Sequence, residues 1–151
     1  MNLAVLLNDY LKSIGQADHS GSSEGSLFEI TLNDVLSIRV SELAGPPTMI
    51  CLQYEVGSVP LDADSDFFRR CLHANFQARS AFDACIAINE ANSVLALLVR
   101  YPLADLDSER FQTMLEDFSA QAQRLFAVMS EHEYASRHFS PQLPTDNFTR
   151  V

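Results

Sequence analysis

The sequence predicts an α+β fold in which an antiparallel sheet of about five strands is covered by three helices. In three segments apolar residues recur at spacings of three and four, as on one face of a helix. In the segments between them apolar and polar residues alternate, as in half-buried strands. The predicted order is α-β-β-β-α-β-β-α, and 151 residues is the length of one ordinary domain.

The first helix is predicted at the amino terminus, with Gly15 placed to cap its end. Its apolar stripe consists of Leu3, Leu6, Leu7, Tyr10, Leu11 and Ile14. Residues 16–26 are rich in serine and glycine and predict a flexible loop.

A hairpin and a third strand are predicted next. Asn33 and Asp34 supply the turn of the hairpin, and Gly45-Pro46-Pro47 separates it from the third strand. One face of each strand is apolar, and the three faces are Phe28, Ile30 and Leu32; Leu36, Ile38 and Val40; and Ile50, Leu52, Tyr54 and Val56.

Helical spacing returns from about Asp64. The stripe of this second helix is unusually aromatic and contains Phe67, Phe68, Cys71, Leu72, Asn75 and Phe76. Two strands follow, "AFDACIAI" and "SVLALLVRY", joined by a tight turn in "NEANS". The later strand is apolar on both faces, since Val94–Val99 is an unbroken apolar run.

A long final helix is predicted to begin at the N-cap Asp107. One apolar stripe runs along it for about five turns, from Phe111 to Met129. From about Glu133 the periodicity is lost and two prolines follow, so we expect a single domain over residues 1–132 and a loose tail over 133–151.

Charge and composition exclude several classes of protein. A net charge of −10 would repel a phosphate backbone, so nucleic acid is not an expected partner. The three cysteines are far apart and fit neither a disulfide framework nor a zinc site, which favours a reducing cytoplasm. The amino terminus lacks a signal-peptide pattern, and no apolar run reaches the roughly 20 residues that span a bilayer.

Enzyme and metal sites are weakly indicated. His132-Glu133 lacks the second histidine that a zinc protease helix has four residues after the first, because position 136 is Ser. Cys71 and His73 would lie about 200° apart around a helix, too far to form a catalytic pair. The acidic run from Asp62 to Asp66 lacks the glycine and the final glutamate of a calcium loop. We therefore expect no catalytic residue, no cofactor and no metal.

The apolar surface instead predicts association. A domain of this size has difficulty covering both faces of the strand over residues 94–101 as well as a phenylalanine-rich helix. A symmetric dimer would cover each apolar patch with the same patch of a second copy. The alternative is that these residues form the core of a monomer.

The order of elements and the segment over residues 72–126, "LHANFQARSAFDACIAINEANSVLALLVRYPLADLDSERFQTMLEDFSAQAQRLF", resemble the Tir chaperone (CesT-like) family, the class I chaperones of bacterial type III secretion. Matching features are the small acidic chain, a first helix that ends near Ile14-Gly15, and an Asn75 that closes the second helix. The polar turn before the apolar strand and the Leu-Asp that precedes a phenylalanine-bearing last helix also match. The likeness covers about residues 1–130, and "NEANS" departs from it where many relatives have a glycine.

The resemblance implies a cytoplasmic bacterial homodimer that serves virulence. It would bind the non-globular N-terminal segment of a secreted effector and keep it soluble and secretion-competent without ATP, and it would not insert into a membrane. Candidate effector-binding residues are Leu3, Leu7, Tyr10, Phe28, Ile30, Leu36 and Ile38, each of which could equally be core. Candidate dimer-interface residues are Phe68, Leu72, Phe76, Leu95, Leu97 and Val99.

Two other functions stay open at this point. A protein of the same fold could sequester a regulator of the secretion system, in which case its partner would be folded. An enzyme that uses Cys71 or His132 would lose its function when Cys71 is replaced by serine, whereas a chaperone would lose only some packing.

Overall fold

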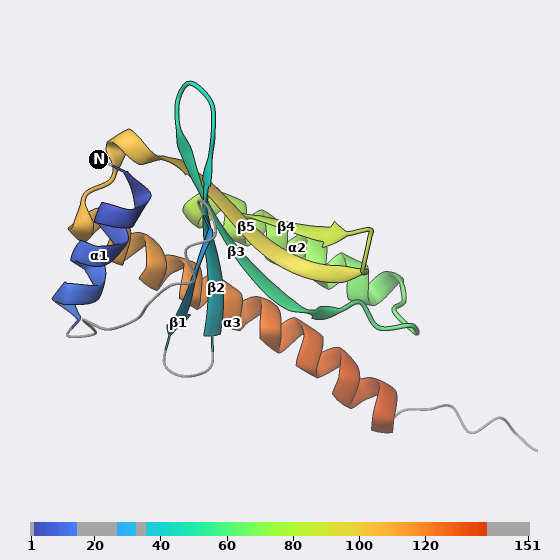
Figure 1. The fold of residues 1–151 in the computed structure, drawn as a ribbon. Coiled ribbons are helices and arrows are strands. Elements are labelled where there is room, and N and C mark those ends of the chain that lie inside the picture. Colours follow the sequence, from blue (N-terminus) through green and yellow to red (C-terminus); the bar gives the residue numbers. More distant parts are fainter. Residues whose placement is uncertain (1, 15–26, 33–35, 139–151) are drawn as a thin grey trace, which may run out of the picture.

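The computed structural model describes residues 2–14, 27–32 and 36–138, and it has the predicted α+β architecture (Figure 1). Five antiparallel strands form one sheet in the order β1-β2-β3-β5-β4. The elements are α1 (Leu3–Ser13), β1 (Leu27–Leu32), β2 (Leu36–Leu43), β3 (Met49–Ser58), α2 (Ser65–Phe82), β4 (Cys85–Asn89), β5 (Val94–Pro102), a short 3₁₀ turn η1 (Leu103–Asp105) and α3 (Ser108–His138).

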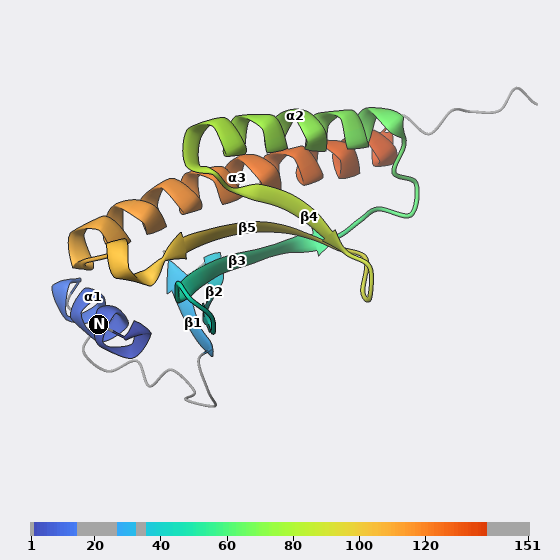
Figure 2. The same ribbon diagram turned by 90° about the horizontal axis from the view of Figure 1, so that it is seen from above.

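The helices and the sheet form two layers. Figure 2 shows α2 and α3 side by side over one face of β3, β5 and β4, with α1 near the start of α3. None of the described helices covers the opposite face of these strands. The core lies between the layers, and its largest fully buried side chains include Phe67 from α2 and Phe111 and Phe118 from α3.

Side-chain caps begin each of the three helices. Asn2 Oδ1 accepts the amide N–H of Val5 at 2.9 Å, and Asp64 Oδ1 accepts that of Phe67 at 2.8 Å. The predicted N-cap Asp107 is confirmed, because its Oδ1 accepts the amide N–H of Arg110 at 2.9 Å. Each cap satisfies an amide that has no partner within its helix.

The second helix is longer than the sequence predicted. It runs to Phe82, so Asn75 does not close it and Ala81 and Phe82 do not begin the next strand. Asn75 Oδ1 instead accepts the backbone N–H of Ile86 at 2.7 Å, which ties the middle of α2 to β4. The helix ends at Asp83, whose φ of 51° is left-handed.

The last helix is also longer than predicted. It extends through residues 133–138, where the sequence predicts the start of the loose tail. The prediction relied on the loss of apolar periodicity, yet the first proline after Glu133 is Pro141 and nothing in residues 133–138 breaks a helix. Gly15, the Asn33-Asp34 turn, the loop over 16–26 and the rest of the tail lie outside the described residues.

Candidate functional site

An apolar stripe on α2 faces outward. Phe68, Leu72 and Phe76 lie four residues apart along one side of the helix and are 39%, 67% and 70% exposed. Large apolar side chains that gather on one exposed stripe are typical of a protein-binding surface. This is half of the predicted dimer interface.

The other three predicted interface residues lie elsewhere. Leu95, Leu97 and Val99 point from β5 into the core and are at most 2% exposed. Their face of the strand packs beneath the helical layer, so their side chains lie inside the subunit. The prediction followed the family resemblance, which implies that the second helix and its neighbouring strand form the interface, and a resemblance does not say which face of a strand lies outward.

The helix-free face of the sheet is apolar at its centre and polar toward β1. Ala96 and Leu98 of β5 share this face with Cys51 of β3 and Cys85 of β4, and all four are buried or half-buried. Toward β1, Arg39 Nη1 forms an ion pair with Glu55 Oε1 at 2.8 Å. This face thus combines an apolar strip with a hydrogen-bonded polar patch.

Most of the predicted effector-binding residues are in the core of the subunit. Leu3, Leu7, Tyr10, Ile30, Leu36 and Ile38 are buried, and Phe28 is half-buried. Burial, with a smaller contribution from Glu116, raises the pKa of Tyr10, whose ring packs edge-on against Phe111 with centroids 5.5 Å apart. Of the seven, Phe28 on the edge strand β1 is the side chain that reaches the surface.

Two exposed apolar residues, one on α1 and one on β1, were missed by the sequence analysis. Val5 of α1 is 47% exposed and Leu27 of β1 is 48% exposed. Val5 lies off the buried stripe of its helix, and Leu27 lies on the face of β1 opposite Phe28. Helical and strand periodicity identify the buried side of each element, so they gave no reason to select these two.

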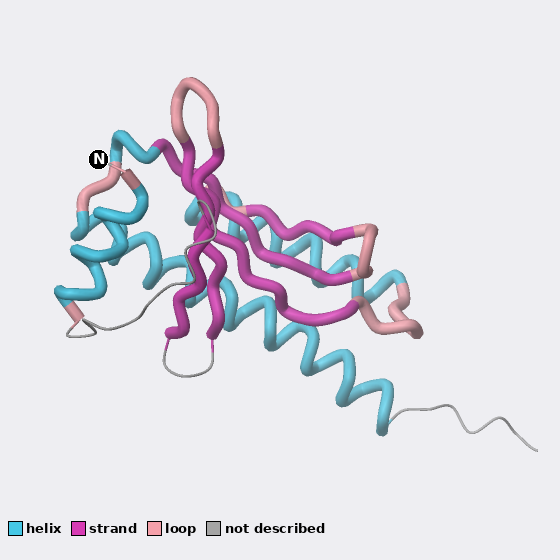
Figure 3. The backbone as a smooth tube through the Cα atoms, viewed as in Figure 1, coloured by secondary structure: helices cyan, strands magenta, loops and turns pink. Residues whose placement is uncertain are grey.

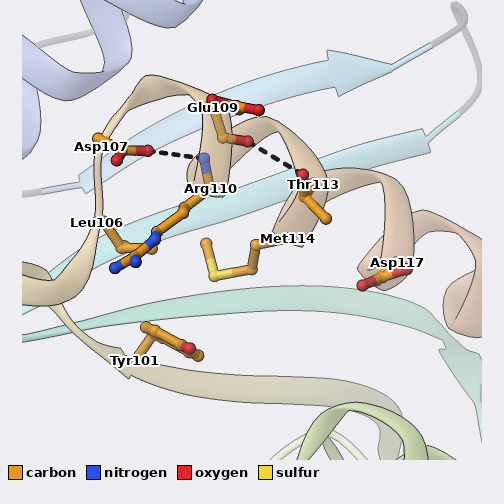
Figure 4. Close-up of a pocket in the computed structure, with 8 residues that line it drawn as sticks. All are labelled: Tyr101, Leu106, Asp107, Glu109, Arg110, Thr113, Met114 and Asp117. Carbon is orange, nitrogen blue, oxygen red and sulfur yellow. Dashed lines mark hydrogen bonds between the residues drawn. The ribbon is translucent and has the colours of Figure 1, made fainter.

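The structure also contains a surface pocket of about 710 Å³ between the start of α3 and the end of β5 (Figure 4). Its lining residues are Tyr101, Leu106, Asp107, Glu109, Arg110, Thr113, Met114 and Asp117. The sequence analysis did not select this group, because its members come from β5, from α3 and from the segment that joins them, and only the fold brings them around one pocket.

Two of the histidines in the described residues have contacts that the structure defines. His132 is buried, its ring lies 4.9 Å from that of Phe67, and its Nε2 lies 3.5 Å from Asp62 Oδ1. His73 shares a hydrogen bond with Gln77 on the surface of α2. Within the described residues, no three His, Cys, Asp or Glu side chains gather as a metal site would require.

Cys71 is expected to be unreactive in the folded protein. Burial raises the pKa of its thiol, so less thiolate is present near neutral pH than in an exposed cysteine. We predict that iodoacetamide at pH 8, followed by mass spectrometry, modifies Cys71 at least about tenfold more slowly in the native protein than in guanidinium chloride. Equal rates would show that the thiol is accessible in the folded protein and would contradict this prediction.

Within the described residues, no helix has the length and hydropathy needed to cross a membrane.

Comparisons with known proteins agree on one fold. The chain matches the complex of ExsC and ExsE with a TM-score of 0.65 and 20% identity, over 84% of this chain and 96% of the matched one. It matches the HopA1–SchA chaperone–effector complex with a TM-score of 0.67 and 8% identity, over 82% and 92%. It matches the heterodimeric ExoU–SpcU complex from the type III secretion system of Pseudomonas aeruginosa with a TM-score of 0.64 and 16% identity, over 81% and 96%.

No relative is found among curated protein sequences. The model of the Tir chaperone protein (CesT) family, however, matches residues 31–125. This range contains the end of β1, the whole of β2, β3, α2, β4 and β5, and the first half of α3. The chain therefore belongs to the Tir chaperone protein (CesT) family.

Proposed function

We propose that this protein is a type III secretion chaperone of the bacterial cytoplasm that, as a homodimer, binds the non-globular N-terminal segment of a secreted effector. It keeps that segment soluble and secretion-competent without ATP. Membership of the CesT family supports this function, as does a fold shared with the chaperone–effector complex HopA1–SchA. The observation that carries the proposal is the exposed α2 stripe, because it is an apolar surface that the subunit does not cover by itself.

The homodimer would form through this stripe. Burying a large apolar side chain contributes about 1.5–3 kcal/mol, and a two-fold axis places each of the three residues in the interface twice. Phe68, Leu72 and Phe76 would then make the contacts. Leu95, Leu97 and Val99 would contribute indirectly, by holding β5 rigid beneath α2 and α3.

The effector segment would bind beside α1 and β1. β1 is an edge strand of the sheet, so one side of its backbone can pair with an added strand. Phe28 is half-buried at this edge, and Val5 and Leu27 are exposed apolar side chains on the two elements that could add further contacts. The buried candidates Leu3, Leu7, Tyr10, Ile30, Leu36 and Ile38 would form the floor that holds these residues in place.

Replacing Phe28 by aspartate is expected to weaken effector binding at least about tenfold, because an apolar anchor is lost and a charge enters its place. The protein is coexpressed with the amino-terminal segment of a candidate effector from the same bacterium, and the copurified amounts are compared. Thr31→Asp is the matched control, because Thr31 is exposed on the same strand but on the opposite face. Equal recovery of the segment by both variants would contradict the placement of the site.

The same coexpression separates a chaperone from a regulator of this fold. A chaperone retains the isolated amino-terminal segment, and removing that segment from the effector abolishes the complex. A protein that sequesters a regulator retains a folded partner instead.

A further inference from the structure

The sheet has a second free edge, next to β4. The five residues of β4 pair with Val94–Leu98 of β5. β5 continues to Pro102, and over Val99–Pro102 its described strand partner is β3 alone (Figure 3). In antiparallel strands alternate residues direct their N–H and C=O groups to opposite sides, so part of this backbone faces outward without a strand partner. Such an edge can accept an extended chain.

The pocket of Figure 4 lies beside this edge. Tyr101, in the part of β5 that β4 does not pair with, is 40% exposed, although its face of the strand is the core face. Figure 4 shows Met114 of α3 opposite the Tyr101 ring, with Arg110 and Asp117 on either side of Met114. The spacing 110, 114 and 117 puts these three residues on one face of the helix. A side chain from an added strand would therefore meet an apolar surface between two charged ones.

The charge of the pocket is negative. Asp107, Glu109 and Asp117 contribute three carboxylates, and no described basic side chain forms an ion pair with them. The lining cation, Arg110, already donates from Nη1 to the backbone carbonyl of Asp105 at 2.9 Å. Asp107 and Glu109 lie at the start of α3, where negative charge stabilises the helix dipole. Asp117 lies beyond the first turn, so this effect does not account for its charge.

We propose that the free edge of β5 over Val99–Pro102 and this pocket together bind a second stretch of the effector, in an extended conformation. This inference rests on the proposed function and adds the chemistry of the bound segment. An apolar side chain packs on Tyr101 and Met114, and a lysine or arginine two residues away, hence on the same face of the strand, pairs with Asp117. A second copy of this chain is a poorer occupant, because its net charge of −10 opposes the carboxylates.

The probe is the blocked peptide acetyl-Thr-Leu-Thr-Arg-Thr-amide, compared with the same peptide that carries neutral citrulline in place of arginine. Each is titrated into the full-length protein, with amide and methionine-methyl NMR as the readout. We expect the arginine peptide to shift the signals of Arg100, Tyr101 and Met114. We expect its dissociation constant to be about three- to fivefold lower than that of the citrulline peptide, as for an exposed ion pair.

Two variants test the role of Asp117. Asp117→Asn is expected to remove the difference between the two peptides. Glu116→Gln removes the same charge at the neighbouring residue, which is exposed and does not line the pocket, and it is expected to preserve the difference.

The inference is overturned if the citrulline peptide binds as tightly as the arginine peptide, or if the Asp117→Asn variant still prefers the arginine peptide. It is also overturned if the NMR signals that shift belong to β1 instead of the end of β5. A further contradicting result would be that the added peptide shifts only the signals of the α2 stripe, where two copies of the chain are proposed to meet. None of these results contradicts the proposed function, provided that the coexpressed effector segment still copurifies with the protein. Failure of copurification together with failure of the peptide would reject both.

Discussion

The Phe76→Glu variant is expected to be a folded monomer. Phe76 is 70% exposed on α2, so glutamate can be accommodated in an isolated subunit with little loss of stability. In a symmetric dimer formed through α2, the same substitution places two carboxylates in an apolar contact. We expect the dissociation constant of the dimer to rise at least about 100-fold, since central apolar residues of an interface contribute 2 kcal/mol or more each. Size-exclusion chromatography with light scattering measures the change.

A matched variant is available on the neighbouring helix. Phe126 of α3 is 54% exposed and lies outside the α2 stripe, so Phe126→Glu introduces the same charge at another exposed phenylalanine and is expected to leave the dimer intact. Circular dichroism should show the same helix content in both variants. A Phe76→Glu protein that stays dimeric would show that α2 is not the interface.

Leu97→Glu is expected to prevent folding instead of separating subunits. Leu97 is fully buried in the centre of β5, where it pairs with Tyr54 of β3 on one side and Ile86 of β4 on the other. A carboxylate there must either remain charged without a partner or be neutralised, and either costs several kcal/mol. Because domains are stable by only about 5–15 kcal/mol, we expect an aggregated or unfolded product.

The milder variant Leu97→Ala is expected to fold, so the contribution of Leu97 to the stability can be measured. Removing a buried leucine side chain costs about 2–5 kcal/mol, and urea unfolding followed by circular dichroism reports it as a lower midpoint with an unchanged slope. Phe126→Ala is the control, since Phe126 is 54% exposed, lies outside the α2 stripe and should change the stability by less than about 1 kcal/mol. Equal losses in the two variants would contradict the placement of Leu97 in the core.

Much of the fold could be predicted from periodicity. The alternation over Phe28–Val40 and Ile50–Val56 identified three strands, and the stripe from Phe111 to Met129 identified the last helix, because one buried face imposes its period on the sequence. The end of α2 could not be found in this way. Residues 77–82 lack a strong apolar stripe, and Asn75, which looks like a helix terminator, uses its side chain to bind the backbone of β4.

The candidate site was harder to predict than the fold. An apolar residue in an amphipathic pattern belongs equally well to a core or to an interface, and only the packing of the other elements decides which. On α2 the outer stripe remained exposed at Phe76, whereas on β5 the helical layer covered Leu97. The pocket at Tyr101 and Asp117 depends on how far β4 extends along β5, a tertiary feature that no local pattern contains.

The most direct test of the central claim is the mass of the purified protein in solution, measured by light scattering alone and again after coexpression with the effector's amino-terminal segment. We predict the mass of two chains in the first measurement and of two chains plus bound segment in the second. A compact single chain that gains no mass from the segment would contradict the account.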